Sequence, residues 1–86
     1  MIKIDIYTTP YCPFCIRAKK LLKDKNINFN EIDLSENPEK FEEMINKSNG
    51  AKTVPQIFVN DAHIGDCDQI HELENKGELD KILKIQ

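Results

Sequence analysis

The feature that most constrains this chain is a pair of cysteines placed where a strand pattern changes into a helix pattern. Residues 2–6 alternate isoleucine with charged side chains, which predicts a strand with one buried face. Residues 8–11 are predicted to form a loop. Cys12-Pro13-Phe14-Cys15 then opens a helix, because proline is tolerated in the first helical position, where its missing N–H needs no partner. The two cysteines are therefore expected at a strand-to-helix junction.

Further strand and helix patterns follow along the chain. A weaker strand is predicted over residues 28–34, and Asn37-Pro38 is typical of a helix start. Asn49-Gly50 is expected to end that helix, whose predicted buried face carries Phe41, Met44, Ile45 and Ser48. Residues 54–59 predict a buried strand that begins at a proline, and His63-Ile64 predicts a short strand after a turn.

A capping-box pattern marks the start of the third helix. Asp66-Cys67-Asp68-Gln69 is expected to open a helix that continues through Leu73 and ends at Gly77. A final helical turn or two would carry Leu79, Ile82 and Leu83. The order β-α-β-α-β-β-α predicts an α/β fold with a four-stranded mixed sheet flanked by helices. At 86 residues the chain is expected to form a single domain, residues 1–86.

Composition narrows the classes of function. Charged residues make up 31% of the chain but the net charge is only −3, which gives no argument for nucleic acid or a membrane surface as a partner. The charged N-terminal stretch does not resemble a signal peptide, and no run approaches the ~18 apolar residues of a membrane span. We therefore expect a cytoplasmic protein. In that reducing compartment, cysteines are interpreted as catalytic or metal-binding rather than as a disulfide framework.

The spacing of the cysteine pair suits redox chemistry. Two sulfurs three residues apart on a helix lie one above the other and can close a small disulfide. Cys12 would stand at the N-cap, where unpaired backbone N–H groups and the positive end of the helix dipole stabilise an anion. Because the thiolate is the species that attacks a disulfide, Cys12 is predicted to be the nucleophile. Cys15, one turn further in, is expected to be less exposed and to resolve the mixed disulfide.

Two other interpretations of the cysteines stay open. They could be a pair of core side chains, or half of a metal site that the H-x₃-C-x₃-H run of His63, Cys67 and His71 completes. A zinc site needs four ligands that converge tetrahedrally. His63 falls in the predicted hairpin and Pro13 suits a helix start, so no metal is expected. Cys67 is expected to be buried at the start of the third helix.

Three blocks of the sequence resemble the signature blocks of short bacterial dithiol glutaredoxins, and the likeness covers essentially the whole chain. The blocks are Tyr11-Cys12-Pro13-Phe14-Cys15, Thr53-Val54-Pro55-Gln56-Ile57-Phe58 and Ile64-Gly65-Asp66-Cys67-Asp68. The resemblance implies a thioredoxin fold with a cis Val54–Pro55 bond. It implies a glutathione-dependent oxidoreductase, active in electron transport and cell redox homeostasis, that reduces disulfide-containing or glutathionylated proteins. A monomer without bound cofactor is expected, with glutathione as the reducing co-substrate.

The resemblance further implies a glutathione site. The backbone of Val54 would pair with the cysteinyl part of glutathione, with Thr53 and Pro55 beside it. The N–H groups of Cys67 and Asp68 would hold the γ-glutamyl carboxylate, and the Asp68 carboxylate would hold the γ-glutamyl ammonium. Glutathione would then lie across two segments that are distant in the sequence.

Some positions near this expected site depart from the family pattern. Asp66 stands where the family usually has a second glycine; it can cap the helix, but its negative charge near the ligand carboxylate predicts weaker glutathione binding. Thr9 replaces a common lysine, so Lys52 becomes the candidate for the glycine carboxylate. Phe14 replaces the commoner tyrosine and keeps the aromatic wall. Tyr11, beside the nucleophile, either packs in the loop or shapes the substrate groove.

Two rival functions belong to related proteins. A redoxin served by a flavin-dependent thioredoxin reductase would carry a Trp-Ser-Gly-Phe-Arg-Pro block near its C-terminus, which this sequence lacks. A [2Fe–2S] module would bridge two protomers through the first cysteine and glutathione thiols. In the family, a proline after that cysteine, here Pro13, disfavours cluster assembly.

Overall fold

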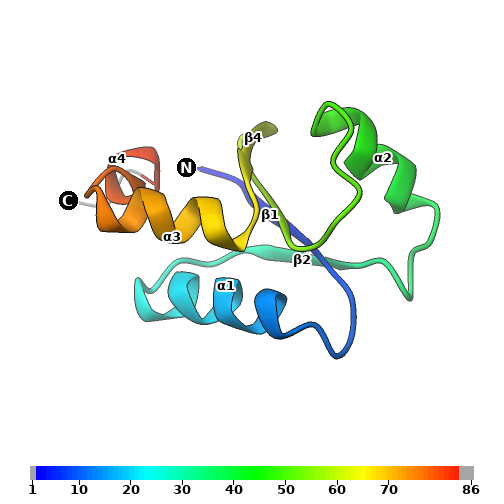
Figure 1. The fold of residues 1–86 in the computed structure, drawn as a ribbon, viewed down its shortest axis with the longest axis horizontal. Coiled ribbons are helices and arrows are strands. Elements are labelled where there is room, and N and C mark those ends of the chain that lie inside the picture. The colour runs from blue at the N-terminus through cyan, green and yellow to red at the C-terminus, as the bar shows by residue number, and fades with distance from the viewer. Residues whose placement is uncertain (1, 84–86) are drawn as a thin grey trace.

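The computed structural model describes residues 2–83, in which helices flank a four-stranded sheet (Figure 1). The strands are β1 (Ile4–Thr8), β2 (Asn30–Asp33), β3 (Gln56–Val59) and β4 (Ala62–Gly65), in the spatial order β2-β1-β3-β4. β1 pairs parallel with β2 and antiparallel with β3, and β3 pairs antiparallel with β4. The predicted mixed sheet is confirmed, although β2 is shorter than the stretch 28–34 that the sequence suggested.

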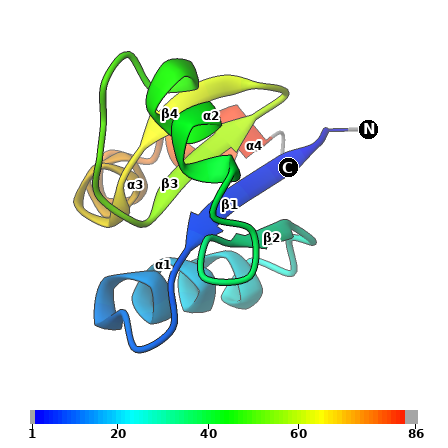
Figure 2. The same ribbon diagram turned by 90° about the vertical axis from the view of Figure 1, so that its right-hand side faces the viewer.

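Helices cover both faces of this sheet. They are α1 (Pro13–Asp24), α2 (Lys40–Lys47), α3 (Cys67–Asn75) and the short α4 (Leu79–Leu83). α1 and α3 lie together on one face, and α2 lies on the other (Figures 1 and 2). The observed order is the predicted one, with α4 as the final helical turns. No helix within residues 2–83 is long and apolar enough to cross a membrane.

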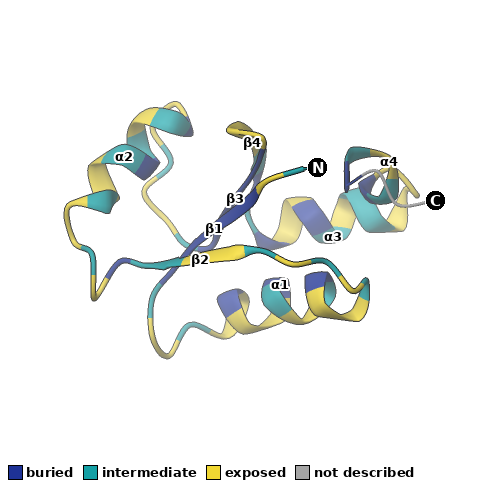
Figure 3. Ribbon diagram, turned by 180° about the vertical axis from the view of Figure 1, so that it is seen from behind, coloured by how far each residue is buried: buried dark blue, intermediate teal, exposed yellow. Residues whose placement is uncertain are grey.

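Strand β1 is buried on both faces, whereas the sequence predicted one buried face (Figure 3). Ile4 and Ile6 pack in a core cluster with α1 and α3, and Tyr7 packs in a second cluster with residues of α2 and β3. Even the charged Asp5 is only 3% exposed. The reason is topological, because β1 is an inner strand between β2 and β3 and has helices on both sides. Thr8, predicted in the loop, is the last residue of this strand.

Helix α2 begins later than predicted. Its first residue is Lys40 rather than Asn37, because the preceding residues form a tight turn in which the Lys40 N–H donates to the Asn37 carbonyl oxygen at 2.9 Å. Met44 and Ser48 are buried as expected. Phe41, predicted on the same buried face, is 38% exposed at the start of the helix. The late start therefore leaves one large aromatic side chain partly in solvent.

The two ends of α3 follow the predicted signals. Asp66 is the N-cap and forms the predicted capping box with Gln69. At the other end Gly77 adopts the left-handed backbone conformation (φ 72°), and its N–H donates back to the last helical turn at 3.0 Å. The chain then turns into α4, where Leu79 and Leu83 join the core cluster that α1 and α3 share.

Candidate active site

The strand-to-helix junction places Cys12 at the N-cap of α1, as predicted. Pro13 follows it in the first helical position. The Sγ atom of Cys12 accepts a hydrogen bond from the N–H of Cys15 at 3.1 Å. This N–H is one of the donors that a helix leaves unpaired in its first turn, so it stabilises negative charge on the sulfur. The N-cap position therefore supplies the Cys12 sulfur with a backbone hydrogen-bond donor.

Cys15 has the opposite environment. Its side chain is only 1% exposed, whereas Cys12 is half-buried. Burial, followed by the hydrogen bond with Cys12, raises the pKa of Cys15 to about 12. The Cys15 thiol is therefore protonated at neutral pH. An accessible sulfur with a backbone donor beside a buried, protonated one fits the predicted roles of nucleophile and resolving cysteine.

The loop before β3 lies against the reactive sulfur. The Sγ atom of Cys12 is 4.0 Å from the carbonyl oxygen of Val54, and the Val54–Pro55 bond is cis, as the family resemblance implied. Gln56 holds this loop in place, because its Nε2 atom donates to the Thr53 carbonyl oxygen at 3.0 Å and to Thr53 Oγ1 at 3.3 Å. The start of β3 thus fixes the backbone of Val54 next to the Cys12 sulfur.

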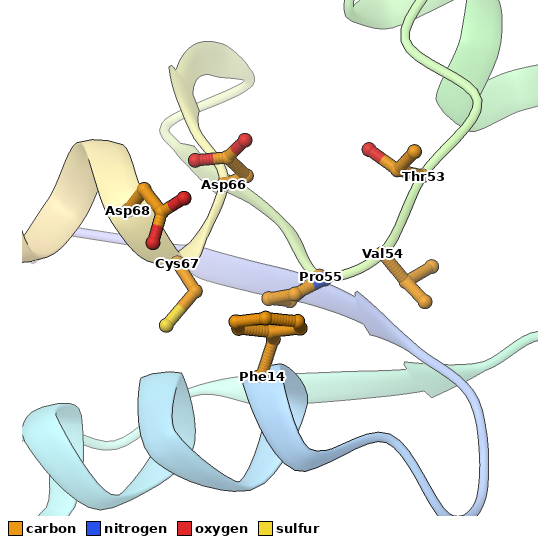
Figure 4. A pocket seen from close by; sticks show the side chains of 7 residues that line it. All are labelled: Phe14, Thr53, Val54, Pro55, Asp66, Cys67 and Asp68. Atoms are coloured by element: carbon orange, nitrogen blue, oxygen red, sulfur yellow. The ribbon is translucent and has the colours of Figure 1, made fainter.

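A groove of about 270 Å³ adjoins the loop and the first turn of α1 (Figure 4). It is formed where α1, the loop before β3 and the start of α3 meet, and its lining residues are Phe14, Thr53, Val54, Pro55, Asp66, Cys67 and Asp68. Figure 4 shows the Phe14 ring projecting from α1 toward Pro55, with Asp66 and Asp68 on the α3 side. We call this cavity the reactive groove.

The reactive groove gathers all but two of the residues predicted to bind glutathione. The exceptions are Lys52, which lines a separate cavity together with Thr9, and Tyr11. The side chain of Tyr11 is 100% exposed and its backbone adopts the left-handed conformation (φ 60°). Tyr11 therefore does not pack in the loop, and its place in the glutathione site stays a prediction.

The start of α3 presents backbone donors to the reactive groove. The Asp66 carboxylate accepts a hydrogen bond from the Gln69 N–H at 3.0 Å, and the Asp66 N–H donates to Gln69 Oε1 at 2.9 Å. This cap does not use the first-turn N–H groups of Cys67 and Asp68, two residues that line the groove. Such donors at a helix N-terminus suit an anion. The Cys67 side chain is buried as predicted, and burial raises the pKa of its thiol.

The sequence matches a known family over most of its length, because residues 4–64 fit the family model for glutaredoxin. The chain belongs to the glutaredoxin family. Glutaredoxin 3 of Escherichia coli K12 is 48% identical to it over 84 residues, which cover 98% of this chain and 100% of that protein. The predicted enzyme class is thereby confirmed as that of the glutathione-dependent thiol–disulfide oxidoreductases.

Solved glutaredoxin structures share the fold. The solution structure of glutaredoxin from Brucella melitensis has a TM-score of 0.83 and 48% identity, and the match covers 99% of this chain and 91% of that one. A buckwheat glutaredoxin–glutathione complex has a TM-score of 0.86 and 27% identity, over 96% of this chain and 77% of that one. The predicted thioredoxin fold is confirmed.

This glutaredoxin also has a positioning residue that the sequence analysis did not single out. Gln56 is buried at the start of β3, where it bonds to Thr53, and its Oε1 atom lies 2.6 Å from Nε2 of His63 on β4. A polar residue inside an otherwise apolar strand, directly after Pro55, was the available signal. Phe14, noted only for its aromatic ring, also lines the reactive groove.

The histidines of this glutaredoxin do not assemble with its cysteines. His63 bonds to Gln56, and burial lowers the pKa of the His63 ring. His71 lies beside α1, in a shallow depression that it shares with Arg17. Within residues 2–83, no group of three or more His, Cys, Asp or Glu side chains could hold a metal ion. The H-x₃-C-x₃-H run is therefore not a converging ligand set in this part of the chain.

Proposed function

We propose that this glutaredoxin reduces protein disulfides and glutathione mixed disulfides through Cys12 and Cys15, with glutathione as the reductant. The observation that carries this proposal is the position of the Cys12 sulfur. It lies at the N-terminus of α1 and 4.0 Å from the carbonyl oxygen of Val54, which lines the reactive groove. A substrate disulfide held in that groove meets a sulfur whose thiolate form the helix favours.

Removal of glutathione from a glutathionylated protein requires one enzyme sulfur. The Cys12 thiolate attacks the glutathione sulfur, a Cys12–glutathione disulfide forms, and the protein leaves as a thiolate that takes up a proton. A second glutathione thiolate then attacks the glutathione sulfur bound to Cys12. This step releases oxidised glutathione and regenerates the Cys12 thiolate. One glutathione thiol is therefore oxidised for each protein thiol that is freed.

Reduction of a protein disulfide uses both cysteines. The Cys12 thiolate attacks one sulfur of the substrate, and the other substrate sulfur leaves as a thiolate. Cys15 then loses its proton to solvent or to the departing thiolate and attacks the sulfur of Cys12. This attack closes the Cys12–Cys15 disulfide and frees the second substrate thiolate. The burial of Cys15 directly behind Cys12 supports this order, because only Cys12 is accessible to the substrate.

Glutathione is expected to lie along the reactive groove. The backbone of Val54 pairs with its cysteinyl unit, and Thr53 lies alongside. The N–H groups of Cys67 and Asp68 bind the γ-glutamyl carboxylate, while the Asp68 carboxylate binds the γ-glutamyl ammonium. The grouping of these residues around one groove supports the assignment, as does the similarity to a glutaredoxin solved with glutathione.

The proposed function also predicts the oligomeric state, the partners and the location of the protein. All the residues it uses come from one chain, so a monomer and a single catalytic unit are sufficient, without a bound cofactor. Disulfide-containing and glutathionylated proteins are the expected partners. The cytoplasm is the expected location, because glutathione keeps thiols reduced there.

The choice of reductant tests the proposal. A small glutathione mixed disulfide is supplied with glutathione, glutathione reductase and NADPH, and NADPH consumption is followed. Robust turnover is expected. No turnover in this system, together with reduction by a thioredoxin reductase, would instead make the protein a redoxin of the other class and would remove the roles given to Val54 and Asp68.

Serine variants distinguish the roles of the two cysteines. Cys12→Ser is expected to lose both reactions, because no nucleophile remains. Cys15→Ser is expected to retain deglutathionylation and to lose the reduction of protein disulfides. Equal loss of both activities in Cys15→Ser would contradict the one-cysteine step.

A further inference from the structure

A second cavity, of about 400 Å³, shares Val54 with the reactive groove. Its other walls come from the loop after β1, the connection from β2 to α2 and the first turn of α2. The lining residues are Thr9, Leu34, Ser35, Pro38, Phe41, Lys52 and Val54. We call it the outer cavity. The other walls of the reactive groove are the loop residues Thr53 and Pro55, the first turn of α1 and the start of α3, so the two cavities adjoin at Val54.

The outer cavity is apolar with a polar edge. Leu34, Pro38, Phe41 and Val54 supply apolar surface, and Phe41 leaves more than a third of its side chain open to solvent. Lys52 is exposed and supplies the one cationic side chain of the lining. Partly exposed aromatic side chains in a concave site are the usual anchors of protein recognition.

The direction of the substrate chain follows from the proposed function, on which this inference rests. With the γ-glutamyl group at Asp68 and the cysteinyl group at Val54, the chain runs from α3 toward Val54. A chain that continues beyond the cysteine therefore reaches the outer cavity. In glutathione only a glycine follows the cysteine, and glycine has no side chain to place against Phe41. A polypeptide substrate has one.

We propose that the outer cavity is a specificity site for polypeptide disulfides. It binds an apolar side chain located one or two residues after the client cysteine that bonds to Cys12. Continuity with the reactive groove through Val54 determines the occupant, because a client disulfide that reaches Cys12 brings its following residues over Leu34 and Phe41. Glutathione reacts at the same sulfur and leaves the apolar wall unfilled.

Symmetric disulfides of short peptides test this assignment. Each peptide contains one cysteine among polar residues, with leucine placed one residue after it, two residues after it, one residue before it or nowhere. Reduced enzyme, free of glutathione, reacts once with each disulfide, giving the Cys12–Cys15 disulfide and two peptide thiols. The rate of thiol release is measured by chromatography.

Leucine at one of the two positions after the cysteine is expected to raise the second-order rate constant roughly tenfold over the all-polar peptide. Leucine before the cysteine is expected to give no comparable gain, because that side faces Asp66 and Asp68. Equal rate constants for all four peptides, or preference for leucine before the cysteine, overturn the proposal.

Variants test whether the preference for leucine peptides depends on Phe41 in the outer cavity. Phe41→Ser is expected to reduce the ratio between the best leucine peptide and the all-polar peptide to about twofold or less, whereas Phe41→Leu retains most of it. Ile16→Ser is the matched control, since Ile16 is an exposed apolar residue on α1 outside both cavities. It is expected to keep the full ratio. A ratio that survives in Phe41→Ser, or is lost in Ile16→Ser, contradicts the assignment.

Different results would contradict the proposed function and the outer-cavity assignment. Wild-type protein that turns over the small glutathione mixed disulfide but shows no peptide preference keeps its proposed function and loses the outer-cavity assignment. Protein without that turnover loses the proposed function itself.

Discussion

At the scale of single residues, two sulfurs in one helical turn differ sharply in environment. Cys12 receives the Cys15 N–H at 3.1 Å and remains accessible, while the Cys15 side chain is enclosed. Position along the first turn of α1 is sufficient to produce this difference, because the N-cap faces solvent and the third helical residue faces the sheet. The CxxC spacing thus supports the proposed division of labour between nucleophile and resolving thiol.

The negative charge of Asp66 is expected to weaken the binding of glutathione. Its carboxylate lies at the start of α3, where the γ-glutamyl carboxylate is expected to bind, so like charges oppose each other. Asp66→Gly is expected to lower the apparent KM for glutathione by roughly threefold, since one carboxylate at a helix terminus is worth ~0.3–1 kcal/mol. Glycine at an N-cap costs only a few tenths of a kcal/mol, so the fold is expected to persist.

Steady-state turnover at varied glutathione concentration measures this effect. Asp66→Asn is the control, because it removes the charge and keeps a side chain that can cap α3. It is expected to lower KM as well. An unchanged KM in both variants would show that the charge does not oppose binding.

At the scale of elements, the first turn of α3 depends on its neighbours in the chain. Gly65 adopts a backbone conformation that favours glycine (φ 136°), and a Cβ atom there would overlap Oε1 of Gln69 and lie 2.7 Å from its Cβ atom. Gly65→Ala is therefore expected to displace Gln69, break the capping box and destabilise the protein by about 1–3 kcal/mol. Urea denaturation measures the loss. Gly50→Ala is the comparison, because it has a positive φ but open space around it. An equal effect of both changes would mean that the cap is not involved.

Burial of the Cys15 side chain in α1 makes the free energy of unfolding depend on pH. In the unfolded chain the Cys15 thiol ionises near its ordinary pKa of 9.0, whereas in the native protein its pKa is about 12. Above the ordinary value the unfolded state gives up a proton that the native state keeps, which favours unfolding. The stabilisation due to this thiol is thus complete below the ordinary pKa and is lost as the pH rises toward the native pKa.

The reduced wild-type protein and Cys15→Ala are compared by urea denaturation between about pH 8 and pH 10.5. The wild-type midpoint is expected to fall more steeply with pH than the midpoint of the variant. Parallel curves would indicate that Cys15 ionises equally in the native and unfolded states.

At the scale of the whole molecule, the sheet with helices on both faces gives two core clusters that meet at β1. Ile6 is 0% exposed at the centre of the larger cluster. Ile6→Ala is expected to lower the free energy of unfolding by about 2–5 kcal/mol, a large part of the total for a domain of this size. Ile16→Ala, on the exposed face of α1, is expected to stay within about 0.5 kcal/mol of wild type. Urea denaturation midpoints measure the stability of both variants. Comparable losses of stability would contradict the burial of Ile6 in β1.

The sequence was sufficient for features that depend on local signals. Pro13 after the first cysteine marked the start of α1, the Asp66–Gln69 pair marked the start of α3, and Gly77 marked its end. Each signal acts through backbone hydrogen bonds within a few residues, so no distant contact was needed to interpret it. The grouping of site residues in one groove came from the family resemblance rather than from periodicity.

The features that were predicted wrongly or missed depend on geometry that the residue pattern does not reveal. The burial of Asp5 follows from the strands and helices around β1, which alternation in residues 2–6 cannot reveal. The exposure of Phe41 follows from the turn that delays α2, and the role of Gln56 follows from its bonds to Thr53 and β4. The burial of Asp5 and the contact of Gln56 with β4 reflect tertiary packing that overrides a local pattern, whereas the exposure of Phe41 reflects a local turn.

We propose that glutathione joined to Cys12 extends along the reactive groove to the start of α3. The NMR spectrum of Cys15→Ser carrying either glutathione or β-mercaptoethanol on Cys12 tests this placement. The two adducts share the disulfide, and only glutathione has a γ-glutamyl group. With this placement, the backbone amides of Cys67 and Asp68 are expected to shift in the glutathione adduct relative to the β-mercaptoethanol adduct. Coincident positions of these two amides in both adducts would contradict it.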